Sequence, residues 1–272
     1  MEVITVILVS YHTGPVLFEA INSLIFQPTI KEIILVDNGN PPEVLNKIRS
    51  LAIPKMNLIT GYGNIGFSAG CNLGAKHATG EYLLFLNPDS VLEQDLAIII
   101  NEIDKEEGLT LLGARILNED GSEQITARRN LLTPINAFVE AFSLYKIFSC
   151  ARVNNFKKAK YVPAISGAFM FIRHNDFHLT GGFDEKYFLH VEDMDFCMRI
   201  TNLGGKIRYV DEMIVRHYLS TSDAPSKFIE YHKTMGAIYY FNKFFNKKYP
   251  VIFLKLLQLA LYLRYLVFFR FT

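Results

Sequence analysis

Apolar runs alternate with amphipathic stretches along the first ninety residues of the chain. A short run that is apolar throughout is typical of a strand buried on both faces of a sheet. Such runs predict strands at residues 3–9, 31–36, 57–60 and 82–86. Helical spacing predicts helices at residues 15–26, 42–50 and 68–78, with Ser68 as the N-cap of the third. Strands that alternate with helices predict an α/β fold with a Rossmann-like, mainly parallel central sheet flanked by helices.

The pattern is looser after residue 90. Helices are expected at residues 94–107 and 191–202, and strands at residues 110–117, 165–172, 206–210 and 213–217. Residues 130–160 form an aromatic and basic stretch with only a weak helical pattern.

The C-terminal residues 252–271 are almost entirely apolar. A spanning helix needs about 20 apolar residues, but Lys255 and Arg264 interrupt this run. Each charge at the centre of a span costs about 2.5–3.5 kcal/mol. We therefore expect a helix that lies in the membrane interface, with basic side chains reaching the head groups. The upstream cluster, Lys243, Lys247 and Lys248, suits anionic lipid. The alternative is a helix packed on the domain or in a dimer interface.

Composition excludes several classes of protein. The chain has 272 residues, of which 50% are hydrophobic and 20% charged, enough for a large core. A net charge of +1 gives no field that would attract nucleic acid. Cys71, Cys150 and Cys197 form neither a zinc pattern nor a disulfide framework, which suits a reducing cytosol. The apolar N-terminus lacks a basic segment and a cleavage site, so we interpret it as a strand and not as a signal peptide.

Two carboxylates follow predicted strands directly. Asp89 comes after the strand at residues 82–86, which Pro88 ends because proline has no N–H to donate. Asp37 follows the strand at residues 31–36. In open α/β sheets ligands bind at this edge, and Mg²⁺ or Mn²⁺ prefers carboxylate and phosphate oxygens. The two acids could hold a nucleotide and a metal-bound diphosphate, or they could simply stabilise turns.

The glycine-rich segment at residues 61–66 matches the dinucleotide fingerprint GxGxxG. It follows the third predicted strand and not the first, and no acidic residue after it is placed to reach a ribose. A nicotinamide or flavin enzyme is therefore disfavoured. The segment is expected to be a tight turn or a loop shaped around part of a ligand.

The richest cluster of acids lies in the helix expected at residues 191–202. Asp195 and Arg199 have the i,i+4 spacing of an ion pair. Glu192 and Asp193 are favoured at a helix N-terminus by its dipole alone, but one of them could face a cleft as a general base. His217 ends a predicted strand and could be a metal ligand, a phosphate donor or a capped surface histidine.

Taken together and in order, several segments resemble the inverting family 2 glycosyltransferases of the GT-A fold. Within that family they look most like the bacterial rhamnosyltransferases that build O-antigen and other cell-surface polysaccharides, lipopolysaccharide included. The matching segments are residues 9–12 (VSYH), 36–38 (VDN), 64–72 (NIGFSAGCN), 80–89 (GEYLLFLNPD), 166–170 (SGAFM), 181–184 (GGFD), 192–199 (EDMDFCMR) and His217.

The resemblance implies one GT-A domain over residues 1–225 and a C-terminal helical extension over residues 226–272. Residues 1–90 would bind the nucleotide sugar, and residues 91–225 would hold the acceptor and the catalytic groups. Asp193 would be the catalytic base, and Asp89 with His217 would bind Mg²⁺ or Mn²⁺ on the donor diphosphate. The implied donor contacts are Ser10, Tyr11, Asp37, Asn64, Gly66, Asn72, Asn87 and Asp89, and the implied residues on the acceptor side are Gly167 and Glu192.

The chain departs from the family pattern in two places. Many members carry Asp-x-Asp at the positions of Asn87, Pro88 and Asp89. The Asn-Pro-Asp form is the one that the rhamnosyltransferase-like members show, and it leaves fewer acids for a metal. Cys71 replaces a basic residue that some relatives carry before the asparagine matching Asn72.

The implied activity is inverting transfer of a sugar from a nucleotide-diphosphate donor to a glycan or polyprenyl-linked acceptor. Rhamnose from dTDP-rhamnose is favoured, and a hexosyltransferase that uses a UDP-sugar is the alternative. The place of action would be cytoplasmic, peripheral at the inner face of the bacterial membrane, and a homodimer is left open. A nucleotidyltransferase is disfavoured because residues 10–14 lack lysine and arginine. A non-catalytic carbohydrate-binding module is disfavoured because it would tolerate loss of Asp89 and Asp193, and both are present.

Overall fold

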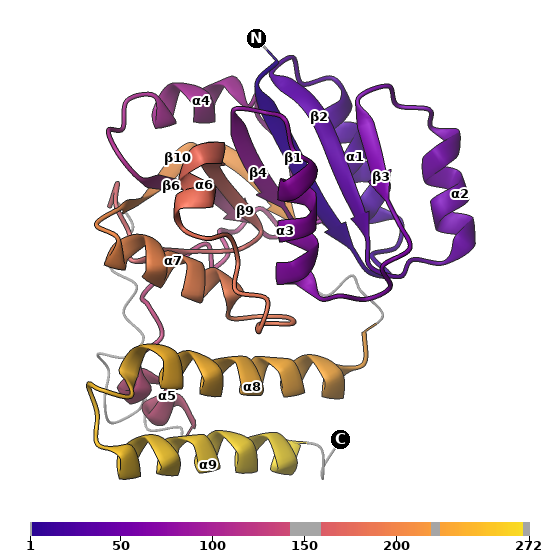
Figure 1. Cartoon of the computed structure of the whole chain (residues 1–272). Coiled ribbons are helices and arrows are strands. Elements are labelled where there is room, and N and C mark those ends of the chain that lie inside the picture. Colours follow the sequence, from indigo (N-terminus) through magenta and orange to yellow (C-terminus); the bar gives the residue numbers. More distant parts are fainter. Residues whose placement is uncertain (1, 142–158, 219–223, 269–272) are drawn as a thin grey trace.

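The computed structural model describes residues 2–141, 159–218 and 224–268 (Figure 1). In this part of the chain the core is an eight-stranded sheet with the strand order β3-β2-β1-β4-β9-β6-β10-β5. Its strands are β1 (Ile4–Ser10), β2 (Ile30–Asp37), β3 (Met56–Ile59), β4 (Tyr82–Leu86), β5 (Ser90–Leu92), β6 (Thr110–Leu117), β9 (Phe169–Arg173) and β10 (Lys206–His217). A second sheet pairs β7 (Arg128–Arg129) with β8 (Ala164–Ile165).

Helices cover the sheet on both faces, and a helical layer lies beneath it (Figure 1). The helices are α1 (Val16–Ile25), α2 (Pro42–Ser50), α3 (Phe67–His77), α4 (Ala97–Ile103), α5 (Pro134–Ala141), α6 (His174–Leu179), α7 (Glu192–Asn202), α8 (Ser226–Phe245) and α9 (Val251–Phe268). The lower layer consists of α8, α9 and α5, in which α9 contacts both of the others. The α/β class with flanking helices and a C-terminal helical extension is therefore observed.

The first half of the sheet is parallel, as the alternation of strands and helices predicts. β2, β1 and β4 are buried along almost their whole length, and their apolar residues form the core. In the register, Ser10 of β1 lies beside Asp37 of β2, and Leu8 of β1 lies beside Leu86 of β4. The carboxyl ends of these strands therefore meet at one edge, and Asp89 follows β4 there.

The second half of the sheet is mixed, because β6 and β10 pair in parallel while β9 and β5 run against their neighbours. The sheet as a whole is mainly parallel, as expected. β9 runs antiparallel to both β4 and β6, and β5 runs antiparallel to β10. The expected strand at residues 165–172 is broken into β8 and β9. The break occurs at residues 166–168, where the backbone N–H of Gly167 donates to Asp193. The two strands expected at residues 206–217 are one strand, β10, with an irregularity between Val210 and Ile214.

Ser68 does not cap α3, and that expectation was wrong. The helix begins at Phe67, and Gly66 occupies the N-cap position at φ +86° with no side-chain cap. The N–H of Phe67 donates to the carbonyl of Phe188 (2.8 Å), and a Cβ at Gly66 would lie 2.6 Å from that same oxygen. Glycine is needed here both for the left-handed backbone and for the close approach. Tertiary packing therefore determines where α3 begins.

The C-terminal helix α9 packs one face on the domain. Leu254 and Leu257 are buried, and Phe253 contacts Phe138 of α5 at a ring separation of 5.9 Å. The opposite face is exposed and mostly apolar. The alternative of a packed helix at residues 252–271 thus describes one face of α9. Residues 269–271 lie outside the described residues. Residues 142–158 of the aromatic and basic stretch lie outside them as well. Across the helices that the structure describes, none combines the length and apolar character that crossing a membrane requires.

The packing of α3 on the sheet leads to a first prediction. A Cβ at Gly74 would lie 2.5 Å from a methyl carbon of Ile7 on β1. We expect Gly74→Ala to lower the free energy of unfolding by about 1–3 kcal/mol, the usual cost of overpacking a core. Chemical denaturation measures this, with Lys76→Ala on the exposed side of the same helix as the control. If alanine stabilised the protein by about 1 kcal/mol, as helix propensity alone would require, the close packing would be contradicted.

Candidate active site

A cavity of about 940 Å³ opens at the carboxyl edge of the parallel strands. Its walls come from the strand ends, from the loop before α3, from the start of α7, from the end of β10, and from α8 and α9. Its lining includes Tyr11, Asn64, Gly66, Asn87, Asp89, Arg129, Gly167, His190, Glu192, Asp193 and His217. Most of the site residues predicted from the sequence therefore lie around one cavity.

Asp89 and His217 face each other at this edge. Oδ1 of Asp89 lies 3.1 Å from Nε2 of His217, and both residues are largely buried. The side chain of Gln124 binds His217 twice. Its Nε2 donates to the carbonyl oxygen (3.0 Å), and its Oε1 lies 3.2 Å from the ring Nδ1. Gln124 has no motif that would reveal this role in the sequence.

This arrangement determines which nitrogen of a neutral His217 ring carries the proton. The amide group of Gln124 turns its NH₂ toward a carbonyl, so its oxygen must face Nδ1, which then carries the hydrogen. The lone pair of Nε2 is left pointing toward the carboxylate of Asp89 and the side-chain nitrogen of Asn87, which is 3.2 Å away. Two acceptors that converge in this way have the chemistry that could hold a cation.

Asp193 lies at the start of α7 and is held by three donors. Its Oδ1 accepts the N–H of Met194 (2.7 Å), and its Oδ2 accepts the N–H of Gly167 (3.1 Å). The same Oδ2 pairs with the guanidinium of Arg129. Sequence reasoning missed Arg129, because its distance of 64 residues along the chain from Asp193 leaves no local signal.

The chain enters α7 through two strained residues. His190 and Val191 have φ values of +67° and +70°, although neither is glycine. A β-branched residue in this region is a genuine outlier, and such strain is found most often at functional sites. This conformation places Glu192 and Asp193, the next two residues, in the wall of the cavity.

Glu192 differs from its neighbour in its environment. It is buried, and its Oε2 has no hydrogen-bond partner among the described residues. Burial, reinforced by the charge of Asp193, raises the pKa of Glu192 to about 8. Two adjacent carboxyl groups are thus held differently, Glu192 in its neutral form at pH 7 and Asp193 among three donors.

Ser10 and Asp37 lie just behind the cavity surface. Oδ1 of Asp37 accepts the N–H groups of Gly39 (3.0 Å) and Asn40 (2.7 Å) and the side-chain amide of Asn40 (2.8 Å). The hydroxyl of Ser10 donates to Asn40 as well (3.1 Å). The turn considered as the alternative for Asp37 is therefore present, and Tyr11 and Asn38 are the neighbouring residues that line the cavity.

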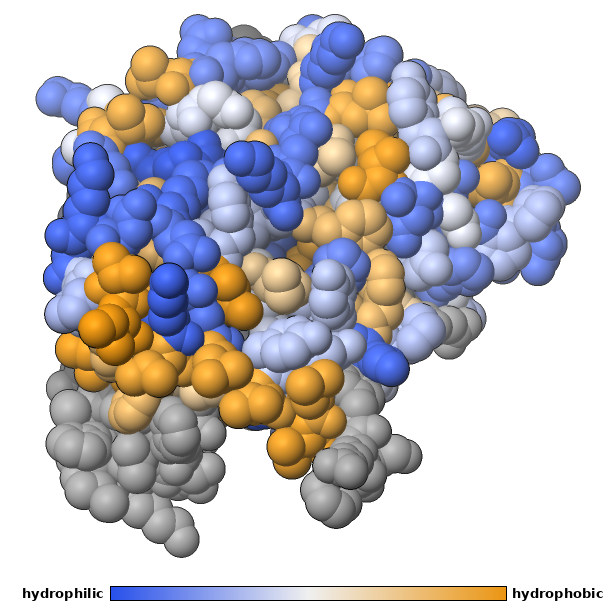
Figure 2. All heavy atoms as spheres, turned by 60° about the horizontal axis from the view of Figure 1, so that its bottom comes forward, coloured by the Kyte–Doolittle hydropathy of each residue, from blue (hydrophilic) through white to orange (hydrophobic). Residues whose placement is uncertain are grey.

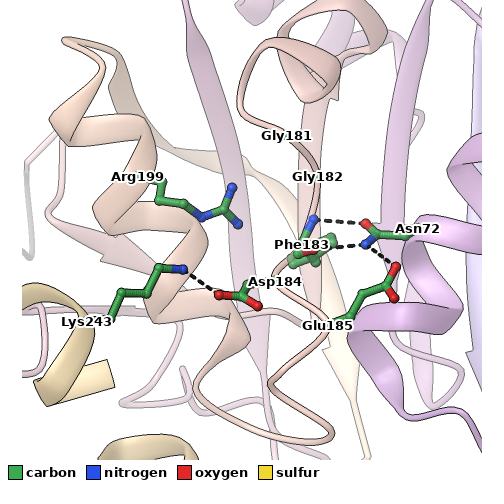
Figure 3. Close-up of a pocket in the computed structure, with 8 residues that line it drawn as sticks. All are labelled: Asn72, Gly181, Gly182, Phe183, Asp184, Glu185, Arg199 and Lys243. Carbon is green, nitrogen blue, oxygen red and sulfur yellow. Dashed lines mark hydrogen bonds and ion pairs between the residues drawn. The ribbon is translucent and has the colours of Figure 1, made fainter. Parts of the chain in front are cut away.

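Asn72 lies away from these residues, in a second depression of about 410 Å³ (Figure 3). Its side-chain oxygen accepts the N–H of Phe183 (2.9 Å), and its amide donates to the carbonyl of Phe183 (2.9 Å) and to Glu185 (2.9 Å). The structure does not bring Asn72 to the larger cavity, because it lies on the side of α3 that faces the loop at residues 181–185. There it fastens that loop to α3.

Lys243 of α8 occupies the same depression, where Figure 3 shows it directed at Asp184. Its ammonium lies 2.6 Å from Asp184 and 2.6 Å from the fully buried Asp195. The expectation that Lys243 faces anionic lipid was therefore wrong, because two carboxylates already neutralise it. The predicted ion pair of Asp195 with Arg199 is confirmed at 2.6 Å. These contacts join α8 to α7, the helix that carries Asp193.

The buried state of Glu192 predicts a pH-dependent stability. A raised pKa means that the folded chain binds this proton more tightly than the unfolded chain, in which glutamate titrates near its ordinary value of about 4.3. The resulting stabilisation is fully present below that value and is lost as the pH rises through about 8. Glutamine stays neutral, so Glu192→Gln should stabilise the protein relative to the wild type at pH 9 more than at pH 4.

Unfolding midpoints measured between pH 4 and pH 9 test this prediction. Glu119→Gln, at an exposed position, is the matched control and should show no such trend. A difference between Glu192→Gln and the wild type that stayed constant with pH would contradict the assigned environment.

The comparisons with known proteins bear on the family and the fold. Rhamnosyltransferase WbbL of Escherichia coli (strain K12) is 24% identical over 143 residues, which cover 53% of this chain and 54% of the relative. The N-acetylglucosaminyl-diphospho-decaprenol L-rhamnosyltransferase of Mycobacterium tuberculosis (strain CDC 1551 / Oshkosh) is 24% identical over 267 residues, 86% of this chain and 82% of the relative. The chain therefore spans about half the length of the first relative and most of the second.

The crystal structure of GalNAc-T7 with UDP, GalNAc and Mn2+ superposes with a TM-score of 0.66 at 18% identity, covering 91% of this chain and 49% of that one. At this identity the likeness concerns the fold, and it confirms the expected GT-A architecture. Residues 5–178, more than half of the chain, match the family described as Glycosyl transferase family 2. The chain belongs to glycosyl transferase family 2.

Proposed function

We propose that this chain is an inverting glycosyltransferase that transfers a sugar, rhamnose in the first place, from a nucleotide-diphosphate donor. The observation that carries the proposal is the shared cavity. The ligand pair of Asp89 and His217 lies at the sheet edge, and the carboxylate of Asp193 lies in the wall formed by α7. Inverting transfer needs the leaving group and the general base on two different sides of one site. Two relatives are named as rhamnosyltransferases, which supports the choice of sugar.

The donor side follows from the parallel strand ends. Tyr11, Asn64 and Asn87 present an aromatic ring and amide groups to the cavity, chemistry that suits a base and a ribose. Asp37 and Ser10 stiffen the turn behind them. The nucleotide is dTDP in this proposal, with UDP as the alternative.

Mg²⁺ or Mn²⁺ fits the chemistry of Asp89 and His217, a carboxylate oxygen and an imidazole nitrogen that converge. Within the described residues there is no group of three or more acidic, histidine or cysteine side chains that could hold a metal ion alone. The donor diphosphate would then complete the coordination, so that nucleotide and cation bind together. Bound there, the cation would neutralise the charge that develops on the leaving diphosphate.

Asp193 takes the proton from the acceptor hydroxyl. Arg129 and the N–H of Gly167 hold its Oδ2 in place, and the N–H of Met194 holds Oδ1. Attack by the deprotonated oxygen on the face opposite the diphosphate inverts the anomeric centre. No covalent nucleophile is required. Burial raises the pKa of the thiols of Cys71 and Cys197, which keeps these two residues in the unreactive form.

The acceptor in this proposal is a lipid-linked glycan at the inner face of a bacterial membrane. The mycobacterial relative is named for a diphospho-decaprenol acceptor, which supports this class. A panel of dTDP- and UDP-sugars, assayed for release of the nucleoside diphosphate, tests the donor. Release from none of them would contradict the proposed activity.

Asp193→Asn should remove the base without removing the donor site. We expect turnover to fall by about 100- to 10,000-fold, the usual contribution of a general base, with donor affinity unchanged. Sugar transfer and calorimetric binding of the donor measure the two effects separately. Asp120→Asn, in an exposed turn, serves as the control. Transfer by Asp193→Asn at the wild-type rate would rule out this assignment.

The cation pair predicts a linked effect of metal and nucleotide. We expect Mn²⁺ to strengthen binding of dTDP or UDP to the wild-type chain, and we expect Asp89→Asn and His217→Gln to abolish that gain. Binding of the uncharged nucleosides should be the same in all three proteins. Isothermal titration with Mn²⁺ or with EDTA measures the difference. An equal gain from Mn²⁺ in the wild type and both variants would place the cation elsewhere.

A further inference from the structure

The C-terminal helices form part of the cavity that holds Asp193. The wall opposite the sheet edge comes from α8 and α9. Its residues include Lys233 and Ala237 of α8 and Leu261, Arg264 and Tyr265 of α9. α9 therefore contributes directly to the cavity that contains Asp193.

The outer face of α9 is largely apolar, with Lys255 as an exposed cation on it. Ile252 is 75% exposed, Leu256 58% and Leu259 52%. Val251, Tyr262, Leu263, Leu266 and Val267 are exposed as well. Figure 2 shows hydrophobic side chains gathered over the lower part of the molecule, where α9 lies. An apolar surface of this kind on a single chain marks a site of interaction.

The two faces of α9 meet next to the cavity. Leu261, Arg264 and Tyr265 line the cavity, whereas Leu263 and Leu266, their neighbours in sequence, are exposed on the outer face. Within about one helical turn, the surface changes from the wall of the cavity to an apolar exterior.

Two cations line this part of the cavity, Arg264 of α9 and Lys233 of α8. Arg264 is exposed and forms no ion pair or hydrogen bond with any residue that the structure describes. The side chain of Lys233 is 57% exposed, and its ammonium lies 3.4 Å from Glu230, a weak surface contact. Arg129 and Lys243, in contrast, are already paired with carboxylates. Arg264 and Lys233 are therefore available to an anionic ligand that enters from α9.

We propose that Lys233 and Arg264 bind the phosphate of a lipid-linked acceptor, with its sugar directed at Asp193 and its lipid chain along the outer face of α9 in the bilayer. The proposal rests on the proposed glycosyltransferase activity, and it assigns the acceptor class to particular residues. The protein presents a carboxylate, two cations and an apolar helix face. These match, in the same order, the sugar, the anionic linker and the long apolar chain of such an acceptor. A water-soluble acceptor would make no contact with the apolar face of α9.

Charge favours a bilayer over a second copy of the chain. α9 contains Lys255 and Arg264 but no acidic residue, and Lys247 and Lys248 are exposed just before it. A two-fold contact through α9 would place the same basic surface of one copy against that of the other. Anionic head groups pair with these cations instead, while the apolar face enters the interface.

Flotation with vesicles tests this inference without requiring turnover. The probes are phosphatidylcholine vesicles, alone or with phosphatidylglycerol or undecaprenyl phosphate at matched negative charge. We expect the wild-type chain to bind both anionic vesicles and to bind those with undecaprenyl phosphate more tightly. Lys233→Gln together with Arg264→Gln should abolish that preference, with a loss of about 5-fold for each cation. Arg264→Lys should retain it in part.

A matched pair of variants separates the lipid contact from general charge. Leu259→Ser with Leu263→Ser, at exposed positions, should weaken binding to all vesicles. Lys76→Gln with Lys105→Gln, at exposed positions on α3 and after α4, should change nothing. Equal binding of phosphatidylglycerol and undecaprenyl phosphate would overturn the phosphate site. Dimers in solution with no flotation would overturn the bilayer as occupant.

The inference and the proposed activity can fail separately. Asp193→Asn should float as the wild type does, because the predicted lipid site does not include the base. A chain that transfers sugar to a soluble acceptor but ignores all vesicles would overturn the lipid site and leave the activity standing.

Discussion

The position of the Asp193 carboxylate depends on two hydrogen-bond donors that come from distant parts of the chain. Arg129 lies on β7, and Gly167 follows β8, the strand with which β7 pairs. In this pairing Arg129 lies beside Ala164, three residues before Gly167. The small second sheet therefore brings both partners of Asp193 to the start of α7. An acid in this largely buried place is tolerated because it is paired and hydrogen-bonded.

The same constraint explains the irregular features around α7. The strand expected through residues 165–172 is broken where Gly167 turns its N–H toward Asp193. The left-handed backbone at His190 and Val191 then directs Glu192 and Asp193 at the cavity. Strain of this kind persists only where the surrounding contacts over-determine it. The ion pairs of Asp195 with Arg199 and Lys243 supply some of those contacts and connect α7 to α8.

The cavity combines two environments that one ligand can connect. At the sheet edge, Asp89, Asn87 and His217 are polar groups held by their neighbours. At the other side, α9 presents an apolar exterior beside the cation of Arg264. α8 belongs to both parts, because Lys243 is fixed to α7 and Lys233 lines the cavity. The C-terminal helices thus form part of the same cavity that the strand ends of the central sheet line.

The sequence by itself determined the elements whose signals are local. The apolar runs predicted β1, β2 and β4, and Pro88 explained why β4 stops before Asp89. The spacing of Asp195 and Arg199 predicted their ion pair, since both residues lie on one helix. The candidate base and the candidate cation ligands were also named from the sequence, through the resemblance of ordered motifs.

Only the tertiary structure decided which partners these residues have. Arg129 lies 64 residues from Asp193, Gln124 lies 93 residues from His217, and Lys243 lies 48 residues from Asp195. No periodicity encodes such pairs, because they depend on how separate elements pack. The same reason explains the place of Asn72, which binds a loop 111 residues away instead of the main cavity. Local pattern thus determines strands and helices, whereas the chemistry of the site arises from contacts that form only when they pack together.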